Sequence, residues 1–563
     1  MKNVEQSTID TIRILSAEAI QKANSGHPGL PMGAAPMAYT LWAKNMTHSP
    51  KNPNWPNRDR FVLSAGHGSM LIYSLLHLFD YGLTMDDLKE FRQEGSLTPG
   101  HPEYGHTLGI ETTTGPLGQG IANAVGMVMA QEYMAAHFNK DDMKIVDNYT
   151  YALAGDGCMM EGIASEAASL AGTLKLDKLI VLYDSNNITI EGDTDIAFTE
   201  NVRERFESYG WQSIFVKDGN DIEEIDKAIK EAKANKTQPT LIEIKTEIGY
   251  GSPAKQGKAS AHGEPLGIDN LKEAREFLGY TEDEFTIADD VLAHMKQLIE
   301  EGNKKEEEWN KLFQEYKKAY PELAKEWEAW HNNEMPDFLN DDDFWNLEKD
   351  QATRESSHNM INYIAKKLPN FIGGSADLAP SNKTNMDDRA SFSHRDYSGS
   401  NIHFGVREHA MAAIANGMKV YGGLHVYCAT FFVFSDYMKN SMRLSALMNL
   451  PVTYVLTHDS IGVGEDGPTH QPVEHLAMLR SMPNMITFRP ADSKETAAAW
   501  YYALTSKDKP TSLALTRQNL PVLDKSGKEA LKGAYIAGDI TAQDADIIMI
   551  GTGSEVHLVL EAA

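Results

Sequence analysis

The sequence predicts an α/β protein in which successive parallel-sheet domains follow one another along the chain. Between about residues 60 and 265, short Val/Ile/Leu runs alternate with Ala-rich helical patterns, which is typical of β–α units in a parallel sheet. A second pattern of the same kind runs from about residue 354 to 520, and a third begins near residue 534. Residues 270–335 are rich in Lys, Glu and Trp and are expected to form solvated helices that link the first two units.

The chain length and these changes of pattern predict the domain division. A chain of 563 residues is too long for one hydrophobic core. We expect a first domain over residues 1–320, a linker over 321–350, a second domain over 351–525 and the start of a third over 526–563. In this third part, residues 547–550 are expected to form a strand and residues 555–563 the beginning of a helix. Because so short a segment cannot close a domain, we expect the third domain to be truncated.

Charge and cysteine content exclude several classes of function. The formal net charge of −28 argues against nucleic acid or an anionic membrane as a partner. The two cysteines, Cys158 and Cys428, suggest neither a disulfide framework nor a zinc site. The N-terminus lacks a secretory apolar segment, and no apolar run approaches the ~20 residues that span a membrane. We therefore expect a cytoplasmic enzyme that binds any anionic substrate through a local cluster of positive groups.

The strongest local signal is the segment 154–157, Ala-Gly-Asp-Gly, followed along the chain by Asn186 and Asn187. An apolar run precedes each part, so both are expected at the ends of parallel strands, where open α/β sheets bind ligands. Asp156 and Asn186 offer oxygen ligands that suit Mg²⁺ together with phosphate and water. The flanking glycines allow the backbone to approach a diphosphate closely. The alternative is an ordinary surface Asp-Gly turn.

Six histidines lie in turns or loops and not on periodic apolar faces, and most of these turns are rich in glycine or proline. They are His27, His67, His101, His262, His458 and His470. A single histidine of this kind is usually a structural turn residue, but that explanation does not account for six. Glycine clears space for a ligand, and imidazole supplies adaptable hydrogen-bonding groups. Metal binding fits these histidines poorly, because the sequence has no His-Glu-x-x-His pair.

Two further signals each have a structural alternative. Glu408 precedes an expected helix over residues 410–418, and a carboxyl packed among apolar residues can share a proton with a nitrogen heterocycle. Glutamate is also common at helix N-termini because of the helix dipole. Phe431, Phe434 and Tyr437 recur at a spacing of three, which is typical of a helix core. Their functional interpretation is a flat apolar slot for an aminopyrimidine ring.

Taken together, these segments resemble the transketolase family over essentially the whole chain. The most specific stretches are residues 25–29, 155–161, 373–378, 405–408 and 458–472. The resemblance implies a diphosphate-binding domain, a pyrimidine-binding domain and a C-terminal domain, in a homodimer that holds each cofactor between its subunits. It also implies transfer of a two-carbon glycolaldehyde unit, in the pentose phosphate pathway, from a ketose phosphate such as xylulose 5-phosphate to an aldose phosphate such as ribose 5-phosphate. The reaction would proceed through a thiamine diphosphate ylide.

The resemblance also implies a role for each candidate residue. The ligands of Mg²⁺, or of Ca²⁺, would be Asp156, Asn186 and the carbonyl of Ile188. Thiamine diphosphate would be held by His67, Gly115, Pro116, Leu117, Gly157, Asn186, His262, Glu408, Phe431, Phe434 and Tyr437. Sugar phosphates would contact His27, His101, His262, Arg354, Ser381, His458, Asp466, His470 and Arg517. The catalytic groups would be Glu408, His27, His262 and His470, with Glu161 and Glu166 in a carboxylate network with Glu408.

Two other functions remain as alternatives. A sister thiamine enzyme, such as dihydroxyacetone synthase or 1-deoxy-xylulose-5-phosphate synthase, shares the cofactor machinery. The pair His27 and His101 and the segment 466–470 favour transketolase, which recognises a hydroxylated donor. A non-catalytic cofactor-binding fragment is the second alternative. Glu408 argues against it, since a protein that only binds the cofactor has no use for a carboxyl at the pyrimidine N1′.

Overall fold

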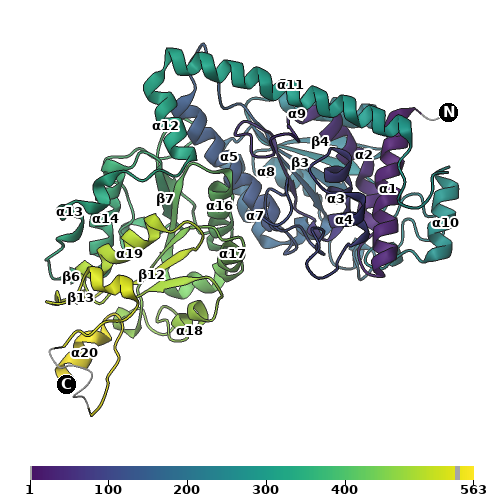
Figure 1. Ribbon diagram of the computed structural model, residues 1–563. Coiled ribbons are helices and arrows are strands. Elements are labelled where there is room, and N and C mark those ends of the chain that lie inside the picture. Colours follow the sequence, from purple (N-terminus) through teal and green to yellow (C-terminus); the bar gives the residue numbers. More distant parts are fainter. Residues whose placement is uncertain (1–2, 539–545) are drawn as a thin grey trace. The chain divides into compact units, whose positions relative to one another are not determined.

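A computed structural model describes residues 3–538 and 546–563 of the chain. The chain divides into two compact units, Met1–Pro321 and Glu322–Ala563 (Figure 1). A five-stranded sheet forms the centre of the first unit and a six-stranded sheet that of the second. In both sheets every pair of neighbouring strands is parallel, which confirms the predicted class of successive parallel-sheet domains.

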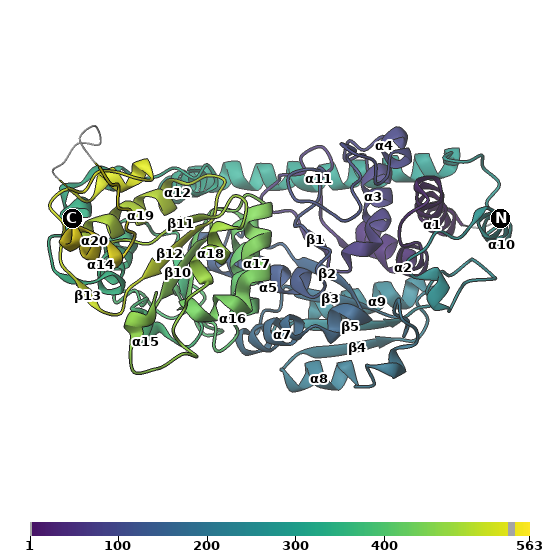
Figure 2. The same cartoon turned by 90° about the horizontal axis from the view of Figure 1, so that it is seen from below.

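The sheet of the first unit has the strand order β1-β2-β3-β5-β4 (Figure 2). Its strands are β1 (Arg60–Leu63), β2 (Thr150–Gly155), β3 (Leu179–Ser185), β4 (Gln212–Val216) and β5 (Thr240–Lys245). Every residue of β1, β2 and β3 is buried, as expected for strands that helices cover on both faces. The register places Gly155 beside Asp184, so the chain leaves β2 and β3 at the same edge of the sheet.

Helices surround this sheet, and a single long helix, α11, extends across the unit (Figure 1). They are α1 (Val4–Ala23), α2 (Gly29–Thr40), α3 (Ser69–Leu78), α4 (Met85–Lys89), α5 (Gln119–Phe138), α6 (Asp156–Met160), α7 (Gly162–Leu174), α8 (Val202–Ser208), α9 (Ile222–Ala234), α10 (Ile268–Phe277) and α11 (Asp289–Ala319). α12 (Pro321–His331) follows at the start of the second unit. No helix in the described ranges is both long enough and apolar enough to span a bilayer.

The sheet of the second unit has the strand order β11-β12-β10-β9-β7-β8. Its strands are β7 (Phe371–Ser375), β8 (Asn401–His403), β9 (His425–Phe431), β10 (Thr453–Thr457), β11 (Ile486–Phe488) and β12 (Thr511–Leu515). A separate antiparallel pair joins β6 (Gln351–Ala352) to β13 (Asn519–Leu520). The helices are α13 (Asp342–Trp345), α14 (Thr353–Lys367), α15 (Ala379–Asn382), α16 (Glu408–Tyr421), α17 (Ser435–Leu447), α18 (His475–Arg480), α19 (Ser493–Thr505) and α20 (Glu555–Ala562).

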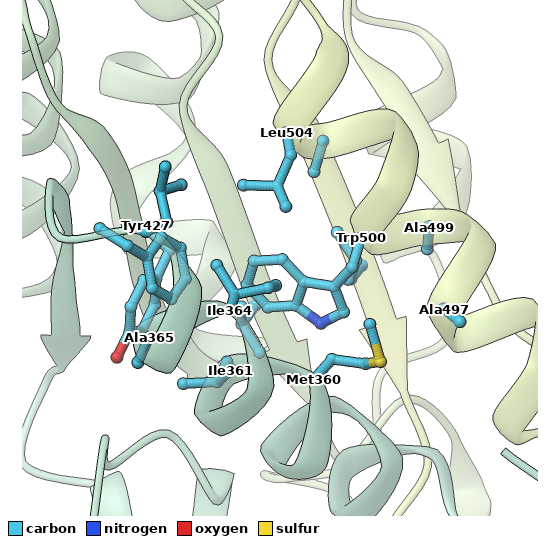
Figure 3. Packing of buried hydrophobic residues seen from close by; sticks show 14 of the residues in the cluster. Met360, Ile361, Ile364, Ala365, Tyr427, Ala497, Ala499, Trp500 and Leu504 are labelled. Carbon is cyan, nitrogen blue, oxygen red and sulfur yellow. The ribbon is translucent and has the colours of Figure 1, made fainter. Parts of the chain in front are cut away.

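The core on one side of this second sheet is centred on Trp500 of α19. Its indole is fully buried and lies beside Ile361 and Ile364 of α14 (Figure 3). The indole nitrogen donates a hydrogen bond to the hydroxyl of Ser357, 3.0 Å away, so no buried donor is left unsatisfied there. α14 and α19 both pack around the Trp500 side chain. Because residues of the six-stranded sheet belong to the same core, this packing fixes the strands from which the loops of the unit extend.

Two local predictions need correction. In the sequence, the helical spacing of Ile12, Leu15 and Ala19 predicts a first helix over residues 8–24, with Ser7 or Thr8 as its cap. It begins at Val4 because the side chain of Asn3 accepts a hydrogen bond from the backbone of Gln6, 2.8 Å away. Residues 547–550 do not form the expected strand. Their side chains are exposed and no strand in the described part of the chain pairs with them, and a strand requires such a partner. The helix expected after them is present as α20. Residues 539–545, inside the expected start of a third domain, lie outside the described ranges.

Candidate active site

A cavity of about 270 Å³ opens at the carboxyl ends of β1, β2 and β3. This edge of a parallel sheet is where α/β folds bind ligands. The lining includes His27, His67, Gly115, Leu117, Asp156, Gly157, Asn186, Ile188 and His262. Nine of the predicted site residues thus come together from six separate segments of the first unit.

Oxygen atoms of Asp156 and Asn186 form one wall of this cavity. The Asp156 carboxylate is only 4% exposed, and burial raises its pKa above the ordinary value. It accepts hydrogen bonds from the hydroxyl of Tyr183 (2.5 Å) and the backbone of Asn187 (3.1 Å). Asn186 Oδ1 accepts a hydrogen bond from the backbone of Ile188, 2.9 Å away. A carboxylate oxygen and an amide oxygen at adjacent strand ends are ligands that suit a divalent cation.

Asp184, the penultimate residue of β3, orients this wall and was missed by the sequence analysis. Its Oδ2 accepts a hydrogen bond from Asn186 Nδ2 at 2.9 Å, and its other oxygen accepts one from the Thr246 hydroxyl. The first of these bonds fixes which way the Asn186 amide faces, because the nitrogen is held by Asp184. Burial raises the pKa of Asp184 to about 7. The signal was available in the sequence, since Asp184 stands two residues before Asn186 at the end of an apolar run.

Four of the six turn histidines gather around the cavity. The His27 ring centre lies 5.2 Å from that of His67, 6.5 Å from that of His101 and 5.9 Å from that of His262. His67 and His262 stack with a centre-to-centre distance of 5.1 Å. Burial is the main cause that lowers the pKa of all four, to about 4 for His27 and about 3 for His67. The rings are therefore neutral near pH 7 and can each donate or accept a proton.

Arg92 is a second residue of this cluster that the sequence analysis did not identify. Its guanidinium donates to the Ser25 hydroxyl at 2.8 Å and lies 3.4 Å from His27 Nδ1. After burial, the charge of Arg92 is the next cause that lowers the pKa of His27. Arg92 lies in no motif that would have singled it out, and only the fold brings it to His27.

Two glycines allow close packing of the side chains at and beside the cavity. A Cβ atom at Gly157 would lie 2.8 Å from Leu117, and one at Gly115 would lie 3.2 Å from the His101 ring. Gly115 also has a φ of +138°, which side chains rarely adopt. A larger residue at Gly157 or Gly115 would therefore displace Leu117, which lines the cavity, or the His101 ring.

A second cluster lies in the second unit and contains the aromatic residues. Phe431 ends β9, Phe434 lies in the short 3₁₀ helix Phe432–Phe434, and Tyr437 is in α17. The helix-core interpretation of their spacing is therefore wrong, because the chain changes element twice between them. The rings of Phe431 and Phe434 lie nearly parallel with centres 6.0 Å apart. His470 is close to both, at 6.3 and 5.3 Å.

Positive and polar groups adjoin these aromatic rings. His458 packs on Phe431 with ring centres 3.8 Å apart, and its Nε2 lies 3.5 Å from a guanidinium nitrogen of Arg354. Arg354 also donates to the carbonyl of Ser381 at 2.9 Å. Burial, followed by the charges of Arg354 and Arg517, lowers the pKa of His458 to about 4. The predicted phosphate-binding residues of this unit thus act on one another.

The remaining predicted residues are placed as follows. Arg517 donates to Glu465 at 2.6 Å, and Asp466 is close enough to His458 to affect its pKa. Glu408 is the half-buried first residue of α16, as its position before the expected helix predicted. Pro116 lies between Gly115 and Leu117 of the cavity lining. The structure thus forms one cluster in each unit.

The residues of the first cluster fit a divalent cation with a diphosphate. The charged form of the buried Asp156 carboxyl, which lies beside a second buried carboxyl at Asp184, is costly unless a positive charge compensates it. His262 Nδ1 is buried and has no hydrogen-bond partner among the described residues, so it is available to an acceptor oxygen.

Fold and site together define a thiamine-diphosphate-dependent enzyme. A family model described as the thiamine diphosphate binding domain of transketolase matches residues 4–336, and one described as the pyrimidine binding domain of transketolase matches residues 349–522.

Individual relatives agree with the family models. The chain is 56% identical to a transketolase of Geobacillus stearothermophilus and 55% identical to one of Bacillus subtilis, each over 100% of this chain and 85% of the relative. A transketolase structure from Leishmania mexicana superposes with a TM-score of 0.97 at 45% identity and covers 100% of this chain and 84% of that one. A transketolase of Pichia stipitis in complex with sedoheptulose 7-phosphate does so at 0.97 and 47% identity, with the same coverage. The chain belongs to the transketolase family and is a thiamine-diphosphate-dependent transferase with transketolase function.

The neutral histidines make the stability of the protein sensitive to acid. Because burial lowers the pKa of His67 to about 3 from an ordinary 6.5, the unfolded chain binds a proton at His67 before the folded chain does. This contribution to stability is complete above pH 6.5 and is lost as the pH falls toward 3. We expect the urea midpoint of His67→Gln to fall less between pH 7.5 and 5.0 than that of the unsubstituted protein. His394→Gln, at an exposed position, is the control, and equal losses in both variants would contradict the burial effect.

Proposed function

We propose that the protein transfers a two-carbon glycolaldehyde unit from a ketose phosphate to an aldose phosphate. The observation that carries the proposal is the cavity lined by the neutral His27, His67 and His262 together with Asp156 and Asn186, with His101 beside His27. Neutral imidazoles can exchange protons with sugar hydroxyls and a carbonyl, and the oxygen wall suits a metal-bound diphosphate. Such a division of one cavity into a sugar-facing and a diphosphate-facing part is what a ketose transferase needs.

The metal ligands of this proposal are Asp156, Asn186 and the backbone carbonyl of Ile188. The buried position of Asp156 supports it, since a cation compensates a carboxylate that has lost its hydration. Asp184 would act as the positioning residue that keeps Asn186 Oδ1 directed at the metal. Mg²⁺ is the ion we propose, and Ca²⁺ accepts the same oxygen ligands.

Thiamine diphosphate, when bound, supplies the electron sink that stabilises the carbanion formed on C–C cleavage. The chain's own residues would bind and orient it. His67, His262 and the backbone at residues 115–117 would hold the diphosphate and thiazolium part. Phe434, with Phe431 and Tyr437 beside it, would accept the aminopyrimidine ring, as flat aromatic faces do. Glu408 would donate or share a proton at the pyrimidine N1′.

The sugar phosphate would be recognised at both ends. His27, His101, His262 and His470 would contact the hydroxyls and the carbonyl around the reacting carbons, and Asp466 would accept from a further hydroxyl. Arg354, Ser381, His458 and Arg517 would bind the terminal phosphate, for which guanidinium groups offer paired donors. The proximity of Arg354, Ser381 and His458 supports this assignment. It also explains how a chain of net charge −28 binds an anion.

The assembly and division of the protein complete the proposal. We propose a homodimer in which the subunits together form each active site. We also propose that a diphosphate domain spans residues 1–320, a linker 321–350, a pyrimidine domain 351–525, and the start of a C-terminal domain 526–563. Location in the cytoplasm stays a prediction from the sequence.

A coupled assay tests the proposal directly. Xylulose 5-phosphate, ribose 5-phosphate, thiamine diphosphate and Mg²⁺ are supplied together, and each is omitted in turn. We expect release of glyceraldehyde 3-phosphate that depends on the cofactor, the metal and the acceptor. No turnover with ribose 5-phosphate would instead favour a sister thiamine enzyme, if the protein turned over with formaldehyde as the acceptor or with pyruvate as the donor.

Glu408→Gln separates catalysis from binding. An amide at this position is nearly isosteric but cannot donate an acidic proton, so we expect turnover to fall by about 10²–10⁴-fold. Cofactor binding, measured by isothermal titration calorimetry, is expected to persist. Glu223→Gln is the matched control, since Glu223 is also an acidic residue in the first turn of a helix. Near-normal turnover in Glu408→Gln would rule out the N1′ role.

Asp156→Ala tests the metal assignment. Because the carboxylate would link the cation to the protein, we expect thiamine diphosphate affinity to fall by at least about tenfold in the presence of Mg²⁺. When Mg²⁺ is replaced by a chelator, the affinity of this variant for thiamine diphosphate is expected to fall less than that of the unsubstituted protein. Asp195→Ala provides the comparison, since Asp195 is an exposed residue in the short 3₁₀ helix Thr194–Ile196. Equal affinity and equal metal dependence in both variants would show that Asp156 is not a ligand.

A further inference from the structure

A cluster of three ligand-type side chains in the second unit has no role in the proposed reaction. Asp436 is the second residue of α17, His475 is the first residue of α18, and Glu474 stands directly before it. One ligand atom from each of the three side chains lies within 4.8 Å of the other two. The two carboxylates are 58% and 77% exposed, whereas the imidazole is buried.

The state of the His475 ring points to a ligand. The residue is only 3% exposed, and Phe432 packs against its ring with centres 5.5 Å apart. Both ring nitrogens are buried, and neither has a hydrogen-bond partner in the described part of the chain. Buried polar atoms in folded proteins are almost always satisfied. Carboxylate oxygens are nevertheless near: Asp436 Oδ2 lies 3.2 Å from Nε2, outside hydrogen-bond geometry, and Glu474 Oε2 lies 4.0 Å from Nδ1.

We propose that Asp436, Glu474 and His475 form a binding site for Zn²⁺ that is separate from the cofactor site. Zinc–nitrogen and zinc–oxygen bonds of ~2.0–2.2 Å in a tetrahedron place neighbouring ligand atoms about 3.3 Å apart. The 3.2 Å between His475 Nε2 and Asp436 Oδ2 matches one edge of such a tetrahedron. Glu474 completes the set by rotation of an exposed side chain, and water occupies the fourth position. An imidazole ligand selects zinc over the oxygen-preferring Mg²⁺ and Ca²⁺.

Zinc at this position would connect two segments that carry predicted site residues. Asp436 follows Phe434 by two residues, and Glu474 follows His470 by four. A cation held between them fastens the start of α17 to the start of α18. No spaced motif in the sequence indicates this site, because its ligands come from two distant segments.

Zinc titration of the protein loaded with thiamine diphosphate and excess Mg²⁺ tests the proposal. Zn²⁺ is added against a competing chromophoric chelator, and the bound equivalents per chain are counted. We expect His475→Gln to bind one equivalent fewer than the unsubstituted protein. Asp436→Asn and Glu474→Gln are expected to keep the site with an affinity at least about tenfold weaker. Co²⁺ used in place of Zn²⁺ is expected to lose the visible absorption of one tetrahedral ion in His475→Gln.

His358→Gln is the matched control. His358 Nε2 lies 3.5 Å from Asp387 Oδ2, so this pair resembles the proposed site but has no third ligand in the described residues. We expect its zinc stoichiometry to equal that of the unsubstituted protein. Equal stoichiometry and affinity in His475→Gln, Asp436→Asn and His358→Gln would overturn the proposal. If His475→Gln fails to fold, Asp436→Asn decides alone, since it alters an exposed carboxylate.

Discussion

Parallel strands that end together impose the constraint on which the first unit depends. β2 and β3 run side by side in register, so that Gly155 lies opposite Asp184. The carboxylates that follow from this register, Asp156 and Asp184, are both buried, and the charged form of a buried carboxyl is costly. The hydroxyl, amide and backbone donors around them offset part of this cost. In the function we propose, a divalent cation would offset the remaining cost.

Burial also disfavours the charged form of the histidines around the cavity, but it lowers the pKa of an imidazole whereas it raises that of a carboxyl. Burial penalises the protonated imidazole, and so the rings of His27 and His67 stay neutral. The cavity is lined by both buried carboxylates and neutral imidazoles. In the proposed function the carboxylate part of the lining would bind the cation and the imidazole part would exchange protons. Both parts follow from exclusion of water at the end of one sheet, and neither needs a residue of unusual chemistry.

Much of this arrangement could be predicted from the sequence, because its signals are local. The apolar runs before Asp156 and Asn186 predicted two strand ends, and the glycine turns identified the histidines that gather there. Residues 547–550 show the limit of such signals: their side chains favour a strand, but a strand exists only when another one pairs with it.

Other parts of the site depend on contacts between distant segments, which composition and spacing do not encode. Arg92 reaches His27 across 65 positions of sequence. The spacing of Phe431, Phe434 and Tyr437 suggested one helix, whereas a strand end and a 3₁₀ turn bring two of the rings together. A site residue is therefore predictable from the sequence where it directly follows a recognisable strand. It is not predictable where the residue reaches the site only through contacts between distant segments.

The short antiparallel pair of β6 and β13 has a consequence for the history of the chain. It joins residues 351–352 to residues 519–520, so the chain enters and leaves the six-stranded sheet at one place. A segment whose ends meet can be inserted into another protein, or removed from one, without stretching the chain on either side. The six-stranded sheet is thus suited to exchange between proteins as one continuous segment, whose two ends are joined by the short β6–β13 pair.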